Sequence, residues 1–112
     1  MVSDKFGHVK ISENVVACIA GLAATDVKGV AYLYGGVTHD AVTKADAVKL
    51  SRCIRVVISN EGIGVKIAVS VSQEIPVPEV TAAIQEKVKS SIETMTGNEV
   101  LFVDVTVSEV LL

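Results

Sequence analysis

The side chains that could hold a metal ion in this chain are few and scattered. His39 and Asp40 are adjacent, Asp46 follows shortly after them, and His8 lies near the N-terminus. A metal site usually needs three or four ligands at workable spacing, which this set does not offer. We therefore expect these residues to be solvated loop positions and predict no metal site.

Two cysteines, Cys18 and Cys53, could act as nucleophiles or as a redox pair. They are too far apart for a C-x-x-C motif and too few for a zinc site. Cys18 lies among small residues, which favours a packed side chain over a nucleophile. In a reducing compartment we expect both to be free thiols.

The glycines form no motif that binds a phosphate or a dinucleotide. Gly62-Ile63-Gly64 is the nearest approach to Gly-x-Gly-x-x-Gly, but Ile67 stands at the third glycine position. The surrounding pattern indicates a hairpin turn followed by a strand, whereas the fingerprint requires a strand followed by a helix. The sequence thus predicts no catalytic or cofactor-binding residue, no cofactor, and a protein that is not an enzyme.

Basic residues near the predicted hairpin offer one further chemistry, the binding of nucleic acid. Arg55 and Lys66 are expected to be neighbours across the hairpin, with Arg52 close by and Phe102 on the same face. One aromatic side chain is too few for the stacking platform of an RNA-binding sheet. The net charge of -3 also argues against bulk attraction to phosphates. A solvated or protein-contacting face is the favoured interpretation, with nucleic-acid binding as the alternative.

The elements that would position these residues fit one domain, residues 1–112. A chain of this length buries roughly two-thirds of its unfolded surface. Half of the residues are hydrophobic, mostly Val, Ala, Ile and Leu. The chain has neither a signal-peptide pattern nor an apolar run approaching about 18 residues. We expect a cytosolic protein without direct membrane insertion.

The first half predicts a short extended segment over Gly7–Ile11 and then a helix from the N-cap Ser12 to about Thr25. The expected buried stripe of this helix is Val15, Ile19 and Leu22. Its other side carries small residues that suit close packing: Ala17, Ala20, Gly21 and Ala24. Gly29 is suited to the positive φ of a turn before a strand over Val30–Tyr34.

The segment from Gly35 to Leu50 has the weakest pattern, with a short polar helix expected over Asp40–Lys49. A β-hairpin follows, in which a loop over Asn60–Ile63 would pair Ile58 with Val65 and Val56 with Ile67. A register shift of two residues would keep the apolar sets on one face, whereas a shift of one would not.

A second helix is predicted with Pro78 at its first position and Gly97 at its end. Its apolar stripe is Val80, Ile84, Val88, Ile92 and Met95. The last strand alternates between two faces. One face has Leu101, Val103, Val105 and Val107, and the other has Phe102, Asp104, Thr106 and Ser108.

This order, β-α-β-β-β-α-β, predicts an α+β fold, a small two-layer sandwich. We expect a mixed or antiparallel sheet with both main helices on one face. The other face would then show a mixed, partly apolar surface that is either solvated or in contact with another subunit. That surface comprises Arg55, Val57, Lys66, Ala68, Phe102 and Thr106.

Short segments in their order and spacing along nearly the whole chain resemble the alkaline-shock-protein family, the Gls-type general stress proteins. They are Gly7–Ser12, Gly29-Val30, Ile54–Ile58, Val69–Val71, Ile75–Val80, Met95–Gly97 and Val103–Val107. The resemblance implies a small cytosolic protein, largely from Gram-positive bacteria, that serves envelope stress and homeostasis without enzymatic activity. It implies no catalytic residues.

The resemblance leads to the hypothesis of a scaffold or interaction module. Such a module would self-associate as a homo-oligomer, or would bind a membrane-anchored envelope protein at the inner face of the membrane. An alternative is a regulator that binds an enzyme of lipid or envelope-precursor synthesis. A nucleic-acid-binding module is the less favoured third hypothesis.

Overall fold

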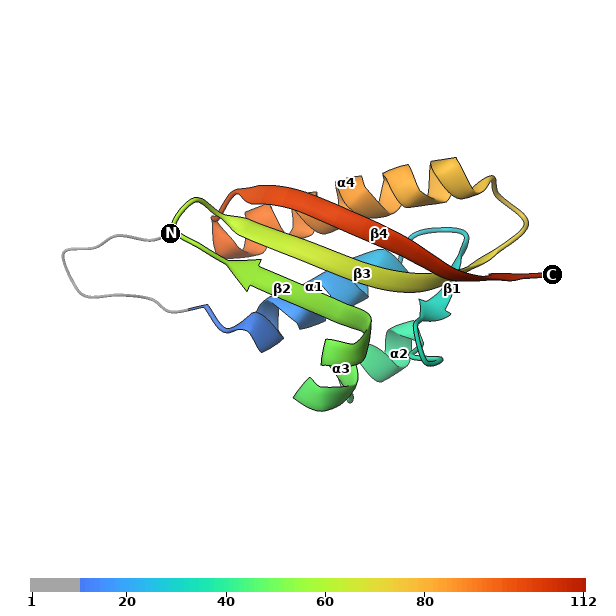
Figure 1. Ribbon diagram of the computed structural model, residues 1–112, viewed down its shortest axis with the longest axis horizontal. Helices are drawn as coiled ribbons and strands as arrows, with labels where there is room; N and C mark the ends of the chain where they lie inside the picture. The colour runs from blue at the N-terminus through green and yellow to red at the C-terminus, as the bar shows by residue number, and fades with distance from the viewer. Residues whose placement is uncertain (1–10) are drawn as a thin grey trace.

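The computed structural model describes residues 11–112, and four strands in this range form one sheet (Figure 1). The strands are β1 (Val30–Leu33), β2 (Ile54–Ile58), β3 (Ile63–Ser72) and β4 (Val100–Leu111). β3 lies at the centre. β4 pairs in parallel along one of its edges, while β2 and β1 pair antiparallel with successive halves of its other edge. The sheet is therefore mixed.

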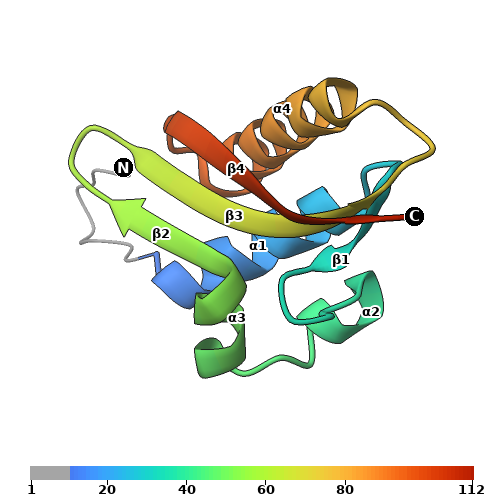
Figure 2. The ribbon, with the colours of Figure 1, turned by 45° about the vertical axis from the view of Figure 1, so that its right-hand side comes forward.

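Four helices complete the described part of the chain: α1 (Glu13–Thr25), α2 (His39–Val42), α3 (Ala47–Cys53) and α4 (Val77–Thr96). α1 and α4 lie behind the sheet in Figure 1, while the opposite face, turned to the viewer, has no described helix over it. Figure 2, turned by 45°, again shows α1 and α4 on the far side of the sheet. The predicted α+β fold with both main helices on one face is confirmed. The predicted first strand falls on residues outside the described range, except for Ile11, which is in no strand.

α1 begins and ends where the sequence predicts, but only part of the predicted stripe is buried. The Ser12 side chain accepts a hydrogen bond from the Val15 backbone N–H at 3.0 Å, which caps the helix. Val15 is 51% exposed, which contradicts the prediction, whereas Ile19 and Leu22 are partly buried and pack against the core. The small residues are buried, as the expected close packing requires, because α1 packs against α4, the sheet and the short helices together. A Cβ on Gly21 would lie 3.1 Å from Val42 Cγ1 of α2.

α4 follows the predicted stripe for four of its five positions. Val80, Ile84, Val88 and Ile92 are buried, whereas Met95 is 69% exposed. The stripe keeps a spacing of four, so the next inward position is Thr96, whose hydroxyl donates to the Ile92 carbonyl.

The C-terminal end of α4 agrees with the prediction, and its N-terminal end does not. Gly97 ends the helix at φ +75°, as predicted. Pro76 is the N-cap, and Pro78 is therefore the second helical residue and not the first. Both positions tolerate proline, because neither N–H has a partner within the helix.

The hairpin is present with a register two residues from the one predicted. Ile58 pairs with Ile63 and Val56 with Val65. The turn lies one residue earlier than expected, because Ser59 and Gly62 exchange backbone hydrogen bonds and Ile63 already belongs to β3. The apolar side chains of both strands still share one face, as a shift of two requires.

The connection between β1 and β2 contains two short helices where one was predicted. α2 ends at Val42, and Asp46 caps α3 by accepting a hydrogen bond from the Lys49 N–H at 2.8 Å. The predicted helix over Asp40–Lys49 is therefore wrong in its bounds. Val42 and Leu50 are buried and join the core from this connection.

Candidate interaction surface

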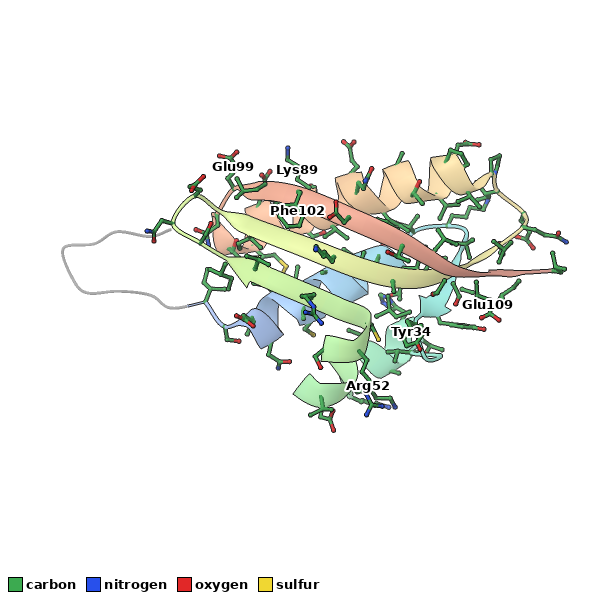
Figure 3. All side chains as sticks on the ribbon, viewed as in Figure 1. Tyr34, Arg52, Lys89, Glu99, Phe102 and Glu109 are labelled. Atoms are coloured by element: carbon green, nitrogen blue, oxygen red, sulfur yellow. The ribbon has the colours of Figure 1, made fainter. Side chains whose placement is uncertain are left out.

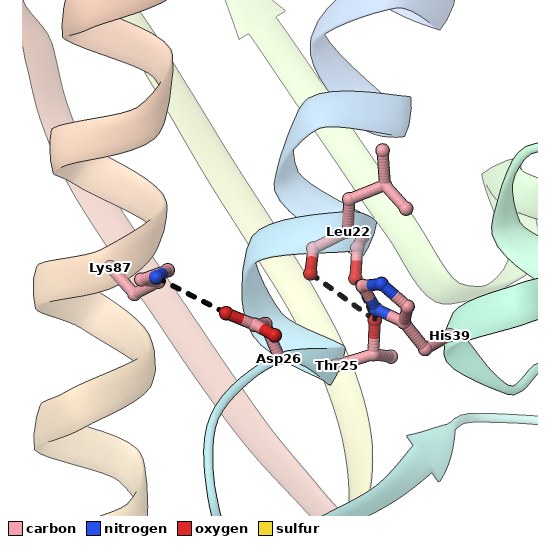
Figure 4. A network of polar contacts seen from close by, with 6 residues as sticks. Leu22, Thr25, Asp26, His39 and Lys87 are labelled. Atoms are coloured by element: carbon pink, nitrogen blue, oxygen red, sulfur yellow. Dashed lines mark hydrogen bonds and ion pairs between the residues drawn. The ribbon is translucent and has the colours of Figure 1, made fainter.

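His39 and Asp46 have structural partners at the start of the short helices, and Asp40 is an exposed residue of α2. His39 Nδ1 lies 2.7 Å from Thr25 Oγ1, and this hydroxyl donates to the Gly21 carbonyl at 2.7 Å. The hydroxyl can then accept from a protonated Nδ1, which ties α2 to the end of α1 (Figure 4). Within residues 11–112 no group of three His, Cys, Asp or Glu side chains could hold a metal ion. His8 lies outside the described residues.

The two thiols are free and packed. Cys18 is half-buried against the core. Cys53 is buried and its Sγ donates to the Tyr34 carbonyl at 3.0 Å. Burial raises the pKa of the Cys53 thiol above its ordinary value, and the charge of Lys49 offsets part of that effect. A protonated, buried thiol is a poor nucleophile.

The uncovered side of the sheet is the largest surface that brings together residues singled out in the sequence. We call it the open face, and it presents four successive rows of side chains across the strands. They are Val57, Gly64 and Phe102; Arg55, Lys66 and Asp104; Ala68 and Thr106; and Tyr32, Ser70 and Glu109. Figure 3 shows Phe102 and Glu109 along β4, with Tyr34 and Arg52 beyond the other edge of the sheet, where β1 and β2 lie.

The first row is apolar, with Val57 48% and Phe102 37% exposed. The Phe102 ring lies over Gly64, since a Cβ on this glycine would be 2.2 Å from two ring carbons. The missing side chain of Gly64 is therefore what allows Phe102 to lie flat on the sheet.

The second row mixes both signs of charge. Arg55 and Lys66 are neighbours across the hairpin, as predicted, but Asp104 is the neighbour of Lys66 on its other side. This row therefore has mixed charge, and Arg52 lines a small hollow together with Arg55 and Lys66. Strand alternation is enough to place Asp104 on this face, but its position beside Lys66 depends on the parallel pairing of β3 and β4.

The fourth row is a hydroxyl and carboxylate cluster that the sequence did not reveal. Glu109 Oε1 accepts from the hydroxyls of Tyr32 and Ser70, each at 3.3 Å. Partial burial raises the pKa of Tyr32, and the negative charge of Glu109 and its hydrogen bond raise it further. Strict alternation would place Glu109 on the helix-covered side with Val107. A register shift in β4 after Val107 turns it to the open face instead.

A register shift also occurs at the start of β4, and it contradicts the prediction that Leu101 shares a face with Val103. Val100 pairs with Ile63 and Phe102 with Gly64, so Leu101 falls between the two pairs. Leu101 is 45% exposed and does not join Val103 in the core. Neither shift leaves a signal such as proline or glycine in the sequence of β4.

Hollows border the open face in several places. One of about 430 Å³ is lined by Tyr32, Tyr34 and Glu109 with the Gly35-Gly36 turn. A larger one of about 630 Å³ lies between the start of α1, α3 and β2. None of the described helices has the length and apolar character needed to cross a membrane.

Comparisons with known proteins agree with the predicted family and fold. The profile of the alkaline-shock-protein family, described as having a cell envelope-related function, matches residues 1–112. The uncharacterized Bacillus subtilis protein YqhY is 30% identical over 91 residues, which cover 81% of this chain and 67% of YqhY.

Solved structures of the MamM CTD are similar in fold. A copper form has a TM-score of 0.53 at 15% identity and covers 88% of this chain and 98% of its own. A nickel form has a TM-score of 0.51 at 16% identity, with coverage of 85% and 95%. At these identities the similarity establishes only the fold. The family profile and YqhY go further, and this chain belongs to the alkaline-shock-protein family, whose function is related to the cell envelope.

Proposed function

We propose that this chain is a non-enzymatic interaction module for cell-envelope homeostasis, which acts on the cytoplasmic side of the membrane through protein contacts. The observation that carries the proposal is the open face. It is one whole side of a sheet, exposes Val57 and Phe102, and has charges of both signs beside them. Exposed apolar groups rimmed by polar ones mark protein contact sites.

Three side chains of types that often serve catalysis make hydrogen bonds that stabilise the fold, which supports a non-catalytic role. His39 joins two helices, the Cys53 thiol bonds to a backbone carbonyl, and Asp46 caps α3. These contacts give each of the three side chains a role in holding the fold together.

The test is sedimentation with membranes. The purified chain is mixed with native inner membranes, with the same membranes after protease treatment, and with protein-free liposomes of the same lipids. We expect it to pellet only with the untreated membranes, since a membrane protein would supply the contact. Replacing Val57 and Phe102 by serine should lower the pelleted fraction at least about tenfold, if they anchor the contact.

A control substitution away from the open face is Glu86→Ser on α4, which lines a hollow with Asp26 and Lys28 beside the end of α1 and should leave pelleting unchanged. Crosslinking the pelleted complex then identifies the partner as an anchored envelope protein or as an enzyme of lipid or envelope-precursor synthesis. A chain that stays in the supernatant with every membrane, or that pellets equally with liposomes, contradicts the proposal.

A further inference from the structure

The hollow of about 430 Å³ beside the fourth row of the open face is lined by both tyrosines of the chain, Tyr32 and Tyr34. We call it the tyrosine hollow. Glu109 and the Gly35-Gly36 turn also line it, and Figure 3 shows Tyr34 and Glu109 toward the same end of the sheet. Its volume is in the range of about 300–1,000 Å³ that is typical of small-ligand sites.

Three hydroxyl groups that line this hollow have already used their hydrogen atoms. Those of Tyr32 and Ser70 donate to Glu109 Oε1, each at 3.3 Å. The hydroxyl of Ser108 donates to the Val69 carbonyl at 3.1 Å. A hydroxyl oxygen whose hydrogen is engaged still has lone pairs that accept. These three groups therefore meet a ligand as acceptors, which favours a ligand that donates hydrogen bonds.

Glu109 adds a negative charge to these acceptors. Its Oε1 accepts both hydrogen bonds of the fourth row, whereas its Oε2 accepts none from any described residue. Within residues 11–112 Glu109 forms no ion pair, and no lysine or arginine lines the hollow. A single carboxylate is too few for a metal ion, which needs about three or four ligands. The lining thus favours an organic cation.

The tyrosine rings distinguish between organic cations. Tyr34 is 51% exposed, so a ligand can reach its ring. Aromatic faces attract cations that lie within about 6 Å of the ring centre, and arginine makes such contacts more often than lysine. A guanidinium group is flat and weakly hydrated, so it can stack on a ring while its edge donates to Glu109 Oε2. An ammonium group has no flat face and loses more hydration on binding.

We propose that the tyrosine hollow binds the guanidinium group of an arginine side chain on the protein partner of the open face. This inference rests on the proposed function and adds one chemical feature of the partner. The Gly35-Gly36 turn leaves room for such a side chain to enter, since a Cβ on either glycine would have no heavy atom within 4 Å.

The test uses the intrinsic tyrosine fluorescence of the purified full chain. The chain has two tyrosines and no tryptophan, and both tyrosines line the hollow, so the signal reports on this site. The protein is titrated with N-acetylarginine amide at constant ionic strength. We expect a saturable change in emission. The citrulline analogue, which is an uncharged isostere, should bind about tenfold more weakly or worse, because a hydrogen bond between charged groups is lost. The lysine analogue should bind about threefold more weakly or worse.

Two substitutions in the hollow and one outside it complete the titration. Glu109→Gln removes the charge at constant size and should raise the dissociation constant for the arginine amide by about tenfold or more. Tyr34→Leu removes the accessible ring and should raise it about threefold, with Tyr32 still reporting. Glu86→Gln removes the same charge from the exposed side of α4 and should leave the affinity unchanged. Matching thermal melts show that the variants are folded.

The sedimentation assay with native membranes tests where the arginine comes from. Glu109→Gln should lower the fraction that pellets with untreated membranes, whereas Glu86→Gln should not. If Glu109→Gln pellets like wild type, the arginine does not belong to the partner and the proposal is wrong.

Three results of the titration also overturn the proposal. They are equal affinities for the arginine and citrulline analogues, a lysine analogue that binds as tightly as arginine, and an affinity that Glu109→Gln leaves intact. The titration needs no partner, so the two proposals fail separately. A chain that pellets with native membranes without binding arginine would refute the guanidinium site alone, whereas a chain that binds arginine and never pellets would refute the proposed function.

Discussion

The two sides of β3 differ more sharply than any other pair of regions in the molecule. The side chains turned toward α1 and α4 form an unbroken aliphatic row of Val65, Ile67, Val69 and Val71, each at most 2% exposed. The intervening positions, on the open face, are Gly64, Lys66, Ala68 and Ser70. One strand thus serves two environments through alternate residues.

This difference separates the source of stability from the site of contact. Full burial of an aliphatic side chain stabilises a fold by about 1.5–3 kcal/mol, and each residue of the row beneath the helices contributes on that order. On the open face β3 has small or charged residues, which contribute little to the core. We therefore expect substitutions beneath the helices to lower the free energy of unfolding, and substitutions on the open face to affect mainly contacts with partners.

Ile84→Asp should have the largest effect. Ile84 is fully buried on α4, and the substitution places an unpaired carboxylate in the core. We expect the free energy of unfolding to fall by roughly 3–5 kcal/mol, enough to unfold a marginal domain. Thermal melting followed by circular dichroism measures the loss.

Met95→Asp is the matched control, because it makes the same kind of change at the exposed end of the same helix. It should alter the free energy of unfolding by no more than about 0.5 kcal/mol. Equal damage from both substitutions would mean that the buried side of α4 is assigned incorrectly.

Gly64→Ala should have an intermediate effect on stability, through a contact that lies on the open face. The new methyl group would overlap the Phe102 ring, and overpacking of this kind costs about 1–3 kcal/mol. In a Phe102→Ala background the obstacle is gone, so the same substitution should become neutral or slightly stabilising. Urea denaturation of the four proteins measures this coupling, and additive effects would contradict the contact.

Glu109→Gln should have the smallest effect and concerns only the open face. In wild type the Tyr32 pKa is raised above its ordinary 10.0 by partial burial and by the Glu109 carboxylate. Removing the charge should lower this pKa, as measured by absorbance titration of tyrosinate in a Tyr34→Phe background that isolates Tyr32.

The raised Tyr32 pKa also predicts how the stability of the protein changes with pH. A pKa raised on folding stabilises the protonated phenol, so its contribution is complete below the ordinary tyrosine pKa and is lost as pH rises through the folded value. Wild type should therefore lose more stability above about pH 10 than Glu109→Gln does. Parallel pH profiles of the two proteins would contradict the Tyr32 and Glu109 interaction.

Alternation in β2 and β3 was sufficient to predict which residues share a face, because a period of two is local information. The pairing of residues across the hairpin was harder to predict. Two registers that differ by two residues bury the same side chains, and the Ser59–Gly62 turn decides between them. The α1 stripe was predicted from the helical spacing of its larger apolar residues. Because α1 packs against α4, the sheet and the short helices, its small residues are buried as well.

The fourth row of the open face could not be predicted for a different reason. Glu109 reaches it through a shift in the pairing of β3 with β4, two strands that α4 separates in the chain. Such a shift depends on how two distant segments fit together, and no residue type in Val105–Val110 indicates it. Arg55 and Lys66, by contrast, belong to one hairpin, and their proximity was predicted correctly.

The central place of β3 has a consequence for how the protein opens in solution. Its amide hydrogens can be freed only when β4 separates from one edge, or when β2 and β1 separate from the other. β1 contributes only four residues to this ladder and is joined to β2 by two short helices. In hydrogen–deuterium exchange, we expect the β1 to α3 region to exchange early as one unit and the middle of β3 to exchange last, at the rate of global unfolding.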